Sequence, residues 1–176
     1  MRQCTSIMLP NVRNYTWRMG IRALPEQPRQ VLIALQTKKP NDQDTNCALF
    51  NHCDVTNMFV VLNSTRYPAI DFQSNFTKNE FNQHFKNMAE FRRKFYGLDQ
   101  LVSSIGVDPI TFKELFTVYV FDVSRQSERI QGGVVDITVE MTFGTEIPDN
   151  TTAYAVLFSD RKMRFQSDGK KMSVIM

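Results

Sequence analysis

The chain has 176 residues, of which 42% are hydrophobic and 22% are charged. These proportions are typical of folded globular domains and exclude wholesale disorder. The formal net charge of +3 does not by itself favour a nucleic-acid binder. No apolar run approaches the roughly 18 residues of a membrane-spanning helix, and the first residues lack the apolar core of a secretion signal. We therefore expect a single domain over residues 1–176 that has no membrane span and is not secreted.

The first half of the chain alternates apolar and polar residues with period two, the pattern of β-strands. It is clearest at Tyr15, Trp17 and Met19, which would share one side of a half-buried strand. The apolar run at residues 30–36 predicts a strand covered on both faces, and residues 38–44 form a polar loop. The expected strands in this half span residues 14–22, 30–36, 55–62 and, more briefly, 67–72.

The middle of the chain changes to helical spacing. Five apolar residues recur at intervals of three and four, which predicts one buried helix face: Phe81, Phe85, Met88, Phe91 and Phe95. Thr77 and Glu80 fit a capping box at the helix start, and Gly97 is suited to end it. Asp108 and Pro109 predict a second, shorter helix to about Phe116. The predicted helical insertion therefore spans about residues 77–116.

Period two then returns to the end of the chain. The strongest strand pattern is at residues 135–143, and the others span residues 117–123, 152–158 and a last strand through Met163 and Phe165. Residues 166–176 are expected to be a tail. Seven to eight strands without βαβ alternation predict an all-β, antiparallel sandwich with an inserted amphipathic helix and a second short helix.

Cysteine and histidine offer one candidate metal site. Cys47, His52 and Cys53 could hold zinc, but neighbouring residues on a strand point to opposite faces and no fourth ligand is evident. We favour a loop histidine beside small buried cysteines, with a Cys47–Cys53 disulfide as a further alternative. The odd total of three cysteines favours a reducing compartment.

No arrangement of residues predicts catalysis. The chain has no glycine-rich nucleotide loop and no paired carboxylates, and His84 is predicted to lie on the solvated side of the first helix. We therefore expect no enzyme and no catalytic, cofactor-binding or metal-binding residues. The basic residues 92–94 and the basic C-terminal end are expected to be solvated, with contact to nucleic acid or an acidic partner as the alternative. Four Asn-x-Ser/Thr sequences, beginning at Asn14, Asn63, Asn75 and Asn150, are interpreted as chance and turn chemistry.

Several phrases together resemble the major capsid proteins of polintons (Mavericks), which also occur in adintoviruses. Residues 28–37, PRQVLIALQT, are similar to the strand that opens the family's second jelly roll. Further phrases follow in the family's order at residues 50–53, 62–64, 67–68, 122–128, 135–137, 148–154 and 159–161. The resemblance covers about residues 17–161. Gln30 stands where the family is expected to have an aromatic residue, and Asn51 where it is expected to have an acid.

The resemblance implies a capsid subunit. The family fold is a double jelly roll, two eight-stranded sandwiches side by side, with three subunits in each pseudo-hexagonal capsomer. This chain is too short for two sandwiches, so the resemblance implies the C-terminal one alone. It implies self-assembly into a trimer or larger shell with other capsid proteins, in a virion formed inside the host cell, and no small-molecule substrate. The alternative is a domesticated jelly roll recruited as a binding module.

The resemblance also implies structural roles for its motif residues. It implies that residues 148–150 turn the chain, that Asn63 and Ser64 cap a strand end, and that Asp122 or Arg125 pairs locally. None of these roles is catalytic.

Overall fold

The computed structural model describes residues 2–23, 27–37, 46, 48–98, 106–126, 135–160, 164–167 and 172–175. Within these ranges the elements are β1 (Arg2–Met8), β2 (Asn14–Ala23), β3 (Pro28–Thr37), β4 (Val55–Leu62), β5 (Thr65–Tyr67), α1 (Asn82–Tyr96), α2 (Pro109–Leu115), β6 (Val118–Asp122), β7 (Val135–Phe143), β8 (Thr151–Ser159), β9 (Arg164–Ser167) and β10 (Met172–Ile175).

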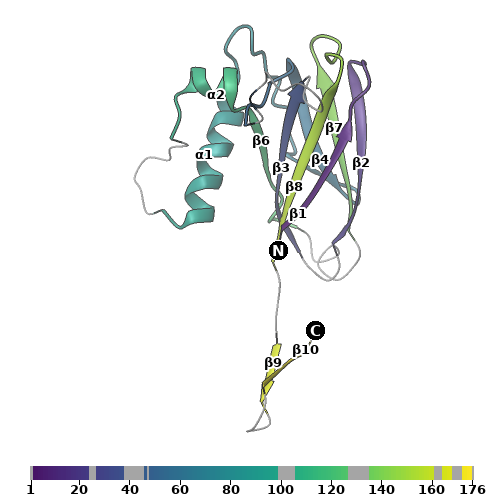
Figure 1. Cartoon of the computed structure of the whole chain (residues 1–176), viewed down its shortest axis with the longest axis vertical. Helices are drawn as coiled ribbons and strands as arrows, with labels where there is room; N and C mark the ends of the chain where they lie inside the picture. The colour runs from purple at the N-terminus through teal and green to yellow at the C-terminus, as the bar shows by residue number, and fades with distance from the viewer. Residues whose placement is uncertain are drawn as a thin grey trace.

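Eight of the strands form a sandwich of two sheets (Figure 1). One sheet has the order β1-β8-β3-β6 and the other β2-β7-β4-β5, and every neighbouring pair is antiparallel. This order, in which the chain passes back and forth between two four-stranded sheets, is the jelly roll. The predicted all-β antiparallel jelly-roll sandwich with two inserted helices is confirmed.

The core lies between the two sheets because period-two alternation sends every second side chain inward. On β3 the inward residues are Val31, Ile33 and Leu35, and β7 supplies Ile137 and Val139; all five are fully buried. Trp17 and Met19 are also buried, as their spacing predicts. The same alternation turns Leu32 and Ala34 to the outer face of the first sheet.

The helical insertion lies beside β6 (Figure 1). Helix α1 begins at Asn82, not at the predicted capping box, and its N-terminal flanking residue Phe81 makes no side-chain cap. The predicted box is wrong because Glu80 is used in a turn, in which its backbone exchanges two hydrogen bonds with that of Asn75. At the other end, Gly97 has the left-handed φ of 61° and donates its N–H to the carbonyl of Arg93, as predicted.

Helix α2 follows its predicted bounds. The carboxylate of Asp108 accepts hydrogen bonds from the N–H groups of Ile110 and Thr111, both at 3.1 Å, and Pro109 occupies the first turn. Hydrogen bonds from Thr111 lower the pKa of Asp108, so this cap is ionised at neutral pH.

Three elements differ from the predictions. Strand β1 was not predicted, because its residues carry almost no apolar alternation; its pairing with β8 along seven positions defines it. The short strand expected at residues 67–72 lies instead at Thr65–Tyr67, because Pro68 cannot donate to a strand ladder. The predicted tail contains β10, which pairs with β9 in a separate two-stranded sheet.

Candidate functional site

The outer face of the first sheet carries an apolar hollow of about 530 Å³, here called the sheet groove. The strand register places Leu32 beside Val156 and Ala34 between Tyr154 and Val118. The lining residues come mainly from β3, β6 and β8, and all but one of them are apolar or aromatic: Leu32, Ile33, Ala34, Gln36, Phe50, Val118, Tyr154 and Val156.

Further apolar side chains adjoin the sheet groove. The backbone N–H of Phe50 donates to the carbonyl of Leu115 at 2.9 Å, which places the end of α2 next to the groove. Leu115 and Phe116 are 39% and 37% exposed, and Tyr154 inside the groove is 37% exposed. The apolar surface therefore extends from the sheet to the end of α2.

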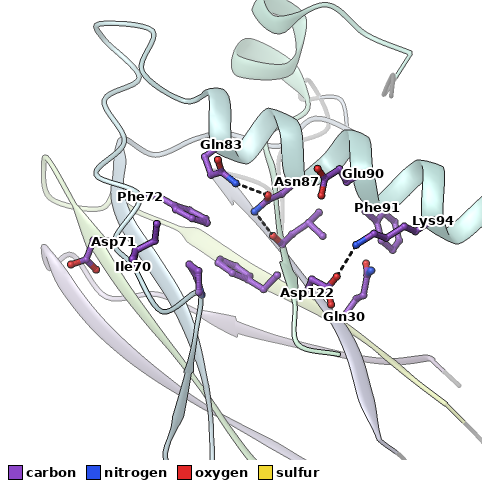
Figure 2. A pocket seen from close by; sticks show the side chains of 13 residues that line it. Gln30, Ile70, Asp71, Phe72, Gln83, Asn87, Glu90, Phe91, Lys94 and Asp122 are labelled. Atoms are coloured by element: carbon purple, nitrogen blue, oxygen red, sulfur yellow. Dashed lines mark hydrogen bonds and ion pairs between the residues drawn. The ribbon is translucent and has the colours of Figure 1, made fainter. Parts of the chain in front are cut away.

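A second hollow of about 480 Å³, the helix pocket, lies between α1, β6 and the segment after β5 (Figure 2). Its polar side chains bind largely to one another. Gln83 donates to Asn87 at 3.0 Å, Asn87 donates to the carbonyl of Val120 at 3.2 Å, and the ammonium of Lys94 lies 3.0 Å from the Asp122 carboxylate. These bonds hold α1 against the edge strand β6.

Two carboxyl groups of the helix pocket are ionised near neutral pH. Burial alone would raise the pKa of Asp122, but hydrogen bonds from Ser124 and the charge of Lys94 hold it below its usual value. Hydrogen bonds from Arg66 and Asn57 likewise lower the pKa of Asp71. Because neither group holds a proton at neutral pH, neither is suited to be a general acid there.

The candidate zinc residues do not form a metal centre in the part of the chain that the structure describes. Cys47 lies outside the described residues. The ring of His52 stacks on Phe76 with centroids 4.5 Å apart, and its Nδ1 accepts the N–H of Asp54 at 2.9 Å. Cys53 is buried, and its Sγ lies 3.6 Å from the Thr37 hydroxyl. No group of three potential metal-ligating side chains occurs among the described residues.

His84 is fully buried, so its predicted position on a solvated helix face is wrong. Its Nε2 lies 2.7 Å from the hydroxyl of Ser74, and its ring meets the ring of Tyr119 edge-on, with centroids 4.9 Å apart. The spacing of the phenylalanines did not predict this burial, because the buried face of α1 is wider than the phenylalanine stripe and also includes His84. Ser74 is only 5% exposed, so the Ser74–His84 pair is closed to a substrate.

The asparagines of three sequons have turn roles, as interpreted from the sequence. Asn63, with a positive φ of 55°, ends β4, and its side chain accepts the N–H of Asp136 at 2.9 Å. Asn75 accepts the N–H of Lys78 at 3.0 Å, and Asn150 has a positive φ of 57° before β8. Locally, Asp122 accepts hydrogen bonds from the N–H of Ser124 at 3.0 Å and from its hydroxyl at 2.6 Å, and its ion pair with Lys94 reaches across to α1.

Fold and surface together define an eight-stranded jelly roll with a helical insertion and an apolar groove on one outer face. A model of the double jelly roll-like domain family matches residues 4–163, and the chain belongs to that family. A search of curated proteins and a search of solved structures returned no match. Among the described residues, neither helix is long and apolar enough to cross a bilayer.

Proposed function

We propose that this chain is a structural subunit of a capsid-like shell and acts by self-assembly, without catalysis. More narrowly, we propose that residues 1–176 form one jelly-roll domain, the second jelly roll of a polinton/Maverick-type, adintovirus-like major capsid protein or a derivative of it. Membership in the double jelly roll-like family supports the structural role. The phrases at residues 28–37 and 122–128 support the narrower assignment through their resemblance.

The sheet groove is the observation that carries this proposal. The apolar run at residues 30–36 is typical of a strand covered on both faces. The core covers one face of β3, but Leu32 and Tyr154 on the outer face remain partly exposed. Large exposed apolar patches on a folded domain commonly mark interaction surfaces. A neighbouring subunit in a shell would supply the missing cover.

The proposal implies its partners and location. The partners are other copies of this chain and other capsid proteins, arranged as a trimer or a larger closed assembly. The place is the virion, assembled inside the host cell. Nothing in this role needs a cofactor or a specific nucleic-acid sequence.

Sedimentation of the purified chain over a wide concentration range, with electron microscopy of the products, tests the proposal. We expect concentration-dependent trimers or larger particles. A charge at Val156, as in Val156→Glu, should weaken association at least about tenfold, because it buries a carboxylate in an apolar contact. The matched control Ile110→Glu, at a 71% exposed site on α2, should associate normally. A chain that stays monomeric at every concentration would contradict self-assembly.

The helix pocket favours a second candidate, a jelly-roll module that binds a small polar ligand such as a sugar. It combines the rings of Phe72 and Phe91 with the amides of Gln83 and Asn87 (Figure 2). Titration with a panel of mono- and oligosaccharides, followed by NMR, separates the two functions. Saturable shifts at Asn87 in a strictly monomeric chain would favour the binding module over the shell subunit.

A further inference from the structure

The C-terminal hairpin of β9 and β10 stands apart from the sandwich, beyond the end of β8 (Figure 1). Its two strands pair antiparallel over four positions, with Phe165 opposite Val174 in the register. Phe165 is 61% exposed. Two strands alone are at best marginally stable in water. This hairpin therefore needs a surface to pack against.

The composition of the C-terminal segment indicates how the hairpin would pack. The strands carry Phe165, Met172, Val174 and Ile175, whereas the residues before and between them include Arg161, Lys162, Lys170 and Lys171. Like basic charges so close in sequence to the strands oppose stacking of one hairpin on another. The exposed ring of Phe165 is therefore left to make contact through a hairpin face, with an apolar surface of another kind.

The sheet groove is such a surface, and its position favours a groove on another molecule. The lining residue Tyr154 lies five residues before Ser159, the end of β8, which is roughly 17 Å along the strand. Only four residues separate Ser159 from β9. The hairpin stands beyond that end of the sandwich and thus away from the groove of its own chain (Figure 1).

We infer that the β9–β10 hairpin is an exchanged arm that docks in the sheet groove of a second copy of this chain, with Phe165 as its anchor. This inference rests on the proposed self-assembly and names its contact. Arm and groove are different surfaces, so the contact is heterologous and passes from one copy to the next. The assembly closes only when the arm of the last copy docks in the groove of the first copy, as in a ring of three copies.

Three variants of the full chain test the contact: Phe165→Asp in the arm, Tyr154→Asp in the groove, and Ile110→Asp as the exposed control. At a concentration where the wild type assembles, we expect the arm and groove variants each to be monomeric by sedimentation. The control should assemble like the wild type. Circular dichroism and thermal unfolding confirm that each variant is folded. If Tyr154→Asp does not fold, Tyr154→Ser replaces it.

Mixing the arm variant with the groove variant gives the decisive measurement. One partner keeps an intact groove and the other an intact arm, so we expect a dimer with one copy of each that grows no further. A mixture that stays monomeric overturns the pairing of arm and groove. Assembly of Phe165→Asp like the wild type overturns the arm inference and leaves the proposed shell function standing. A monomeric wild type overturns both.

Discussion

At the scale of single residues, the packing around His84 decides how the fold responds to acid. The imidazole is enclosed by Phe72, Phe76 and Tyr119, and Ser74 is its hydrogen-bond partner. Burial, with no neighbouring charge to oppose it, lowers the pKa of His84 from 6.5 to about 4. The histidine is therefore neutral in the folded chain over a pH range in which the unfolded chain binds a proton.

The first prediction concerns this proton. Between pH 6.5 and about 4 the unfolded state binds more protons, so the free energy of unfolding falls as the pH falls through that window. The contribution of His84 to the free energy of unfolding is fully present above pH 6.5. It amounts to about 3 kcal/mol relative to acid pH for a pKa shift of this size. Urea unfolding of the wild type and of His84→Gln at pH 7 and pH 4.5 measures it.

The control for His84 is the comparison across pH. Carboxyl groups titrate in both proteins, so only the difference between the wild type and His84→Gln reports the histidine. His52, whose pKa burial also lowers, stays in both. An equal loss of stability in wild type and variant on going to pH 4.5 would show that His84 is not the group responsible.

At the scale of elements, Phe91 anchors helix α1 on the sheet more firmly than Phe95 does. Phe91 is 8% exposed and contacts Phe158 of β8 with ring centroids 5.5 Å apart. Phe95, one turn further on, contacts the same ring at 5.1 Å but is 40% exposed. The two residues are therefore a matched pair: both are phenylalanines on α1 that contact Phe158, and they differ in how far they are buried.

The second prediction follows from that difference. Phe91→Ala should lower the free energy of unfolding by about 3 kcal/mol, since it removes a buried ring, and Phe95→Ala by about 1 kcal/mol. Denaturant unfolding with a linear extrapolation measures both. Equal losses at the two sites, or a loss below about half a kcal/mol at Phe91, would mean that α1 is not docked in solution as described.

At the scale of the whole molecule, β1 closes one edge of the first sheet and covers β8. Its backbone pairs with β8 from Arg2 opposite Phe158 to Met8 opposite Thr152. At the opposite edge, α1 lies against β6 and its Asn87 bonds the carbonyl of Val120. Both edges of this sheet are therefore protected from pairing with another chain. The short polar strand β1 forms one edge, and helix α1 lies beside the other.

The third prediction tests the role of β1. Deleting residues 1–8 leaves an edge of β8 unpaired, so the melting temperature should fall by about 10 °C, or roughly 3 kcal/mol for a domain of this size. Light scattering should also rise on standing, through pairing of the open edge. Deleting residues 164–176 is the control, because β9 and β10 form a sheet of their own; all melting temperatures are measured at a concentration where the wild type is monomeric, so that loss of assembly does not contribute. Equal melting temperatures for the two deletions would contradict the prediction.

The sequence by itself determined the strands in which apolar and polar residues alternate. It also determined the start of α2, where a capping side chain and a proline mark the helix end. Strand β7 was predicted at its observed bounds because Ile137 and Val139 alternate with polar residues, and α2 because Asp108 and Pro109 act locally. The family resemblance was likewise sufficient for the jelly roll, which the family match supports. The strand alternation and the helix cap depend on neighbours in the chain, so the sequence contains them.

Only the tertiary structure decided the features that depend on distant partners. Strand β1 exists because β8 offers it an edge, and His84 is buried because the turn carrying Ser74 and strand β6 enclose it. The sheet groove is equally non-local: Leu32, Tyr154 and Val118 come from three strands, and their alignment depends on register. Pairing and burial between segments far apart in the chain follow from the packing of the whole sandwich, which no local pattern encodes.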